Sequence, residues 1–68
     1  MNEETFNLSM RKFLKTVGIN SQRAIEHAVD QAVSSGAIQG NETFSATVTL
    51  EIAGLKLKLE INEDIKLE

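Results

Sequence analysis

The sequence predicts an α+β fold in which two N-terminal helices pack on one face of a C-terminal antiparallel β-hairpin. Apolar residues recur every three or four positions up to about residue 35, and every second position after residue 43. With 41% hydrophobic and 25% charged residues, the composition is that of a folded globular chain. A chain of 68 residues is long enough for one small core, so we expect a single domain over residues 1–68.

The first helix is expected over residues 3–17, with Asn2 as its N-cap and Glu3 and Glu4 at the positive end of the helix dipole. Gly18 supplies the left-handed residue that commonly ends a helix. The apolar residues of this segment fall on one helical face and are Phe6, Met10, Phe13, Leu14 and Val17.

A second helix is expected over residues 21–35, capped by Asn20 or Ser21 and closed by Gly36. Its apolar face is narrow and rich in alanine, which would let two helices approach closely. The residues of this face are Ile25, Ala28, Val29, Ala32 and Val33.

The alternating segments 43–53 and 55–62 predict two strands joined by a two-residue loop at Ala53-Gly54. That loop sets a register in which the apolar residues pair on one face, namely Ile52 with Leu55, Leu50 with Leu57, Val48 with Leu59, and Ala46 with Ile61. A short third strand is open at Ile65–Leu67 or Ala37–Gln39. The first strand has no Lys or Pro along its edge, so we expect one of these segments or a second copy of the chain to cover it.

Enzyme chemistry finds no support in the residue types. The chain has no cysteine and a single histidine, His27, with Asp30 as its one candidate co-ligand at helical spacing, which is too few ligands for zinc. It also lacks a Gly-rich phosphate loop and an activated nucleophile motif. We therefore expect no enzymatic activity, no metal and no cofactor.

Neither a membrane span nor a secretion signal is visible in the sequence. No apolar run approaches the roughly 20 residues that a membrane helix needs, and the N-terminal stretch MNEETFNLS is acidic and polar. These features predict a soluble protein of the cytoplasm.

Four basic residues and no acidic one occupy the stretch from Arg11 to Arg23, although the net charge is −3. In the predicted fold, Arg11, Lys12 and Lys15 lie at the C-terminal end of the first helix, where the dipole favours cations. Arg23 lies in the first turn of the second helix, where it is disfavoured, so it either pairs with Glu26 or the acidic tail, or faces a ligand.

Leu8 is the other misfit, because it points away from the apolar face of its helix. A single exposed leucine is common, yet the C-terminal tail or another subunit would also cover it. The possible interaction surface therefore consists of Leu8, Arg11, Lys12, Lys15 and Arg23.

The stretch MNEETFNLSMRKFLKTVGINSQ, the following SSGAIQG and the hairpin resemble a family of very small bacterial proteins of unknown function. The likeness covers the whole chain and implies no activity, cofactor or site residue. The order of helix, helix and hairpin also resembles part of a winged helix, although a further helix is missing.

The leading functional hypothesis is a small binding module with a protein partner, or a homodimer formed through the edge of the first strand. The alternative is a nucleic-acid-binding domain that holds phosphates at the corner formed by Arg11, Lys15 and Arg23. The negative net charge disfavours it, because cations that neutralise phosphates dominate the affinity for nucleic acid.

Overall fold

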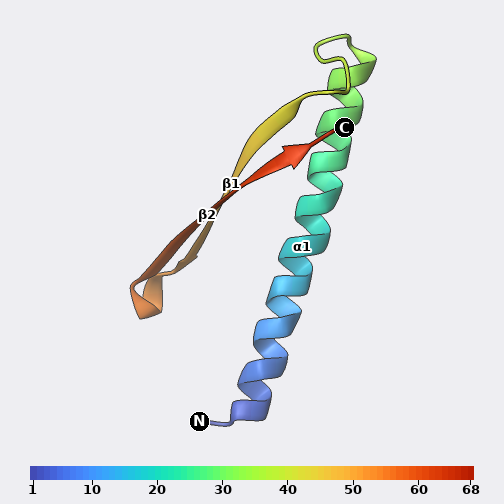
Figure 1. Cartoon of the computed structure of the whole chain (residues 1–68). Helices are drawn as coiled ribbons and strands as arrows, with labels where there is room; N and C mark the ends of the chain where they lie inside the picture. The colour runs from blue at the N-terminus through green and yellow to red at the C-terminus, as the bar shows by residue number, and fades with distance from the viewer. The chain divides into compact units, whose positions relative to one another are not determined.

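The computed structural model describes all residues from 1 to 68 and has an α+β composition. A helix, α1 (Glu3–Ser34), is followed by strand β1 (Thr43–Ile52), a single 3₁₀ turn, η1 (Ala53–Leu55), and strand β2 (Leu57–Lys66) (Figure 1). Contacts divide the chain into two compact units, Met1–Ser35 and Gly36–Glu68. The helix and the hairpin are therefore described separately.

The helix α1 begins at the predicted start of the first helix, residue 3, and ends at Ser34, one residue before the predicted end of the second. The Asn2 side chain accepts a hydrogen bond of 3.0 Å from the backbone N–H of Thr5, which satisfies one of the free donors of the first turn. At the other end Ser35 is the C-cap, and Gly36 follows with φ of 78°. Because this left-handed conformation is strained for residues with a Cβ, Gly36 is suited to the position after the cap.

The prediction of two helices is wrong, because α1 runs without a break through Gly18 and the expected caps Asn20 and Ser21. Gly18 does not adopt the positive φ of Gly36. A glycine inside a helix costs only about 0.5–1 kcal/mol relative to alanine. Ending the helix would instead leave eight backbone groups, four at each new end, in need of other partners.

The prediction of an antiparallel hairpin with one apolar face is confirmed, but its register is wrong by two residues. Val48 lies opposite Ile61 where Leu59 is expected, and the other apolar partners are shifted likewise. A shift of two keeps the side chains that remain in the strands on their predicted faces, since the period of a strand is two. The predicted start of the second strand at residue 55 is wrong, because Leu55 and Lys56 belong to the loop and β2 begins at Leu57. The observed apolar pairs are Ile52 with Leu57, Leu50 with Leu59, Val48 with Ile61, and Phe44 with Ile65.

The loop explains the shift. A two-residue hairpin loop needs positive φ at its first residue, which is unfavourable for Ala53. The chain instead uses four residues, with η1 followed by Lys56 at φ of 53°, and the Lys56 N–H donates to the Ala53 carbonyl at 3.1 Å. The longer loop also pairs Phe44 with Ile65, whereas the predicted register would have placed Phe44 opposite Glu63.

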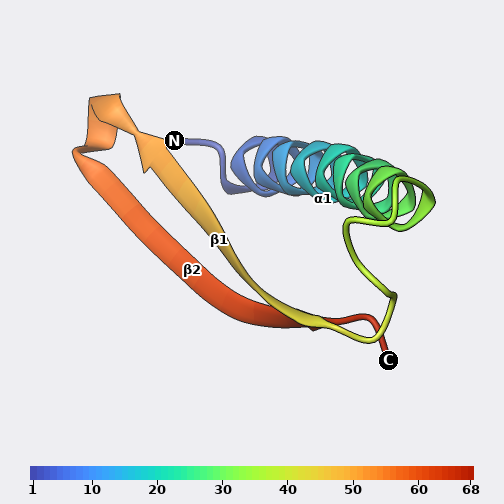
Figure 2. The same cartoon turned by 90° about the horizontal axis from the view of Figure 1, so that it is seen from above.

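No third strand forms, because Ile65 and Lys66 belong to β2 and the sheet has only two strands. β2 continues through residues 62–64, which resemble a turn in the sequence. The pairing extends just past the strands, where the Leu67 N–H donates to the Glu42 carbonyl at 3.0 Å. The result is a long ribbon with the twist usual for paired strands (Figure 2).

Neither the helix nor the hairpin forms a core of its own. No residue, apolar or polar, is buried. A two-stranded hairpin is at best marginally stable alone in water, and most of the stability of a protein helix comes from packing its apolar face. Both units therefore present apolar faces whose stabilising partners have to be identified.

Candidate interaction surfaces

The cations predicted as an interaction surface all lie on α1. We call Arg11, Lys12, Lys15 and Arg23 the basic face, because at 100° per residue they fall within a sector of about 120°. From Arg11 to Arg23 this face spans about 18 Å of helix, at 1.5 Å per residue. Leu8, which is 62% exposed, and Ile19, which is 42% exposed, fall in the same sector.

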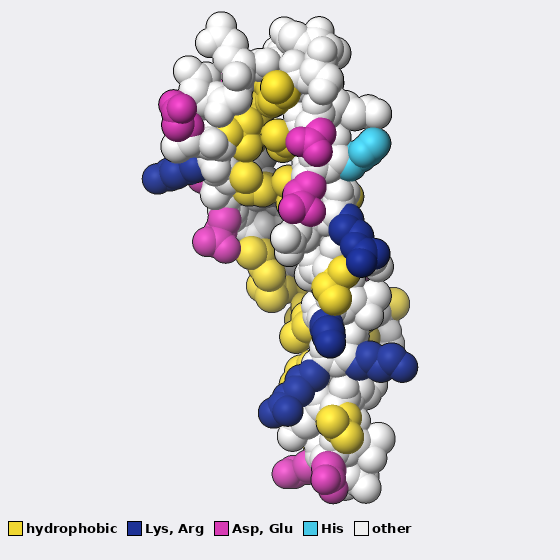
Figure 3. Space-filling model, turned by 90° about the vertical axis from the view of Figure 1, so that its right-hand side faces the viewer, with side chains coloured by type: hydrophobic (Ala, Val, Ile, Leu, Met, Phe, Trp, Pro, Cys, Tyr) yellow, Lys and Arg dark blue, Asp and Glu magenta, His cyan; other side chains and the backbone are white.

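One carboxylate, that of Glu26, lies in the same sector as the basic face, three residues after Arg23. Residues 5–25 contain no Asp or Glu, and none of the side-chain hydrogen bonds in the chain involves a basic side chain. Figure 3 shows a row of Lys and Arg side chains (dark blue) along α1, with acidic side chains (magenta) beyond the row at each end and one further dark-blue side chain apart from it. The arrangement is a cationic segment between two acidic ones.

The continuous helix overturns the explanation that the sequence offered for these charges. Arg11, Lys12 and Lys15 lie in the interior of α1 and not at a C-terminus, and the last turn of α1 contains no basic residue. Arg23 is likewise an interior residue and not the start of a helix. The helix dipole acts only near the ends, so it accounts for none of the four.

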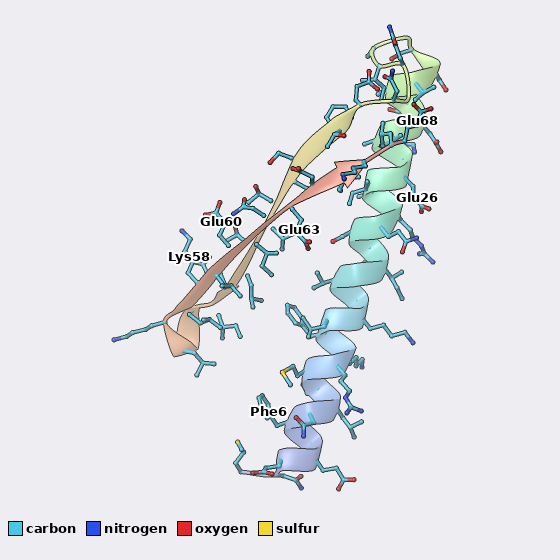
Figure 4. All side chains as sticks on the ribbon, viewed as in Figure 1. Phe6, Glu26, Lys58, Glu60, Glu63 and Glu68 are labelled. Atoms are coloured by element: carbon cyan, nitrogen blue, oxygen red, sulfur yellow. The ribbon has the colours of Figure 1, made fainter.

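A continuous apolar stripe runs along the opposite side of α1. Its members fall at helical spacing on both sides of Gly18, and the bulky ones are half exposed, with Phe6 at 51%, Phe13 at 50% and Leu14 at 52%. Phe6 and the charged Glu26 project from opposite sides of the helix (Figure 4). The apolar stripe comprises Phe6, Met10, Phe13, Leu14, Val17, Ser21, Ala24, Ile25, Ala28 and Ala32.

The hairpin has an apolar face of its own, interrupted by one carboxylate. Glu63 lies opposite Ala46, between the Val48–Ile61 and Phe44–Ile65 pairs. Figure 4 shows Glu60 and Glu63 on opposite sides of the ribbon. The position of Glu63 on this face is not predicted, because residues 62–64 resemble a turn in the sequence.

The other face of the hairpin is polar throughout. Its pairs include Glu51 with Lys58, a favourable pairing of opposite charges. The Thr47 hydroxyl donates to the Asn62 side-chain oxygen at 2.7 Å across the strands. These contacts stabilise the register. The apolar face is therefore the candidate interaction surface of the hairpin.

Glu42 organises the loop before β1, which sequence reasoning also missed. Its carboxylate accepts hydrogen bonds from the backbone N–H groups of Gln39 at 2.8 Å, Gly40 at 2.9 Å and Asn41 at 3.1 Å. The bond from Gln39, followed by that from Gly40, lowers the pKa of Glu42 below its ordinary value. The anion fixes the chain entering the hairpin, and the preceding Gly40-Asn41 turn was the available signal.

Catalytic and metal-binding arrangements are not found. No group of three His, Cys, Asp or Glu side chains is placed to hold a metal ion. A surface depression near the end of α1 is lined by Gln31, Ala32, Ser34 and Ser35, which offer no acid or base pair. The helix α1 also lacks the combination of length and hydropathy that would let it cross a bilayer.

The fold and surfaces define a small α+β protein with one long amphipathic helix and one hairpin. The chain belongs to a family of unknown function, DUF6494, whose model matches residues 1–68. The predicted resemblance to a family without assigned function is thereby confirmed. No curated protein and no solved structure matches the chain.

Proposed function

We propose that this protein is a cytoplasmic protein-interaction module and not an enzyme. The observation that carries the proposal is that the helix and the hairpin, each taken by itself, present a long apolar face and have no core of their own. Exposed apolar surface of this extent marks an interaction site in soluble proteins. Binding a protein partner would remove that surface from water and supply stability that a two-stranded sheet lacks.

The edge of β1 offers a second mode of contact for a protein partner. The sheet contains only β1 and β2, so each strand has one side without a strand neighbour. Lys58 and Lys66 lie in β2 and discourage pairing along its edge, whereas β1 has no Lys or Pro. A partner strand added to β1 would satisfy its free backbone groups.

Site-specific photo-crosslinking in cells tests the proposal. A photoreactive phenylalanine analogue placed at Phe13 on the apolar stripe should yield a discrete protein adduct. The same analogue at Glu26, on the other side of α1, is the matched control and should yield none. Absence of an adduct at Phe13, or equal adducts at both positions, would contradict the proposal.

Nucleic-acid binding is the second candidate, supported by the four cations of the basic face. The winged-helix resemblance no longer supports it, since the structure has one helix and no helical corner. If Arg11, Lys15 and Arg23 bind phosphates, duplex DNA should bind at low salt and dissociate steeply as salt rises, because counterions are released. Replacing all three by alanine should abolish that binding. If the triple variant binds DNA as well as the wild type does, the basic face is not the nucleic-acid site.

A further inference from the structure

A row of residues with heptad spacing runs along α1, and all its positions except the two end ones, Asn7 and Gln31, belong to the apolar stripe. The pattern begins at Asn7, and its positions are separated alternately by three and four residues, the spacing at which one helix packs along another. We call this row the seam. It consists of Asn7, Met10, Leu14, Val17, Ser21, Ala24, Ala28 and Gln31.

The seam is complementary to itself when reversed. Turning a second helix end for end about residue 19 maps every seam position onto another seam position, since the residue numbers of each pair add up to 38. The apolar layers then join a larger side chain to a smaller one, Met10 to Ala28, Leu14 to Ala24 and Val17 to Ser21. The outermost layer joins Asn7 to Gln31, two amides that can hydrogen-bond to each other.

From this complementarity we infer that α1 pairs with α1 of a second copy, antiparallel and centred on residue 19. Layers of one large and one small residue keep the two axes at an even separation. A parallel pair would place Met10 on Met10 at one end and Ala28 on Ala28 at the other, so its axes would diverge. The inference rests on the proposed interaction function and names its partner.

The apolar stripe of α1 is longer than the apolar row of the chain's own hairpin. The stripe from Phe6 to Ala32 is about 39 Å long at 1.5 Å per residue. The apolar row of β1 from Phe44 to Ile52 is about 27 Å long at 3.4 Å per residue. The stripe is therefore about 12 Å longer than the row.

The absence of cysteine makes a direct test of orientation possible. Met10→Cys and Ala28→Cys proteins would be mixed in equal amounts, oxidised mildly and compared with each protein alone. The mixture should form a disulfide-linked dimer, because the two positions share a layer. Each protein alone should not, because identical positions would lie about 27 Å apart, far beyond disulfide reach.

A size exchange tests the same layers without cross-linking. Sedimentation equilibrium of the pure wild-type chain should give twice its mass of 7.5 kDa. Ala28→Leu should weaken the dimer at least about tenfold by overpacking against Met10. Adding Met10→Ala to that variant should restore the dimer, because each layer again holds one large and one small residue.

Two results would overturn the inference. One is a wild-type chain that stays monomeric at a concentration of about 100 μM, which is about 100-fold above the Kd of a weak, micromolar complex. The other is a dimer in which Met10→Cys cross-links to itself. If a monomer nevertheless forms a Phe13 adduct with a protein of another mass, self-association fails while the proposed function stands.

Discussion

Glu63 lies directly opposite Ala46 and places a carboxylate on the apolar face of the hairpin. Replacing Glu63 by leucine should raise the free energy of unfolding by about 1–3 kcal/mol, because it removes a charge that a covering partner would desolvate and adds apolar area. Urea denaturation measures the change. Glu60→Leu, on the polar face, is the control and should give no comparable gain; equal gains would mean that neither face is covered.

Gly18→Ala should stabilise the protein by about 0.5–1 kcal/mol, since alanine is the better helix former and an added Cβ meets nothing within 4 Å. Thermal unfolding followed by far-UV circular dichroism provides the measurement. Gly36→Ala is the matched control and should destabilise, because its φ of 78° is strained for alanine. A loss of stability in both variants would indicate that the helix ends at Gly18 after all.

Lys56→Gly should stabilise the hairpin slightly, by about 0.5 kcal/mol. The left-handed conformation costs a non-glycine residue about 1–2 kcal/mol, and the greater freedom of glycine in the unfolded chain offsets about 0.4–1 kcal/mol of that relief. Lys56→Val should instead destabilise, because branching at Cβ worsens the strain. Chemical denaturation of the two variants should move in opposite directions, and a shift in the same direction would contradict the assigned loop.

Acidification should release the loop that Glu42 organises. Hydrogen bonds lower the folded-state pKa of Glu42 below the ordinary 4.5, so their stabilisation is present above pH 4.5 and lost as pH falls through that lower pKa. The amide NMR signals of Gln39, Gly40 and Asn41 should titrate together with a midpoint below 4.5. In Glu42→Gln this common titration should disappear, whereas in Glu68→Gln it should remain.

The sequence by itself determined the local features of this protein. Asn2 and Gly36 mark the ends of the helical region because capping depends on adjacent backbone groups and on the φ that glycine tolerates. The two faces of the hairpin follow from strict alternation, which a register shift of two leaves intact. The residues of the candidate basic face were also identifiable, since they form an uninterrupted cationic stretch.

The tertiary structure alone decided how these pieces continue. A glycine such as Gly18 is compatible with the end of a helix and with its interior. Which of the two applies depends on whether the turns on either side continue as one helix, and in α1 they do. The register depended on a four-residue loop that ends in a left-handed lysine, a conformation that residue type does not announce. Both decisions rest on the sum of many small backbone and pairing energies over the whole element, and no single residue reveals that sum.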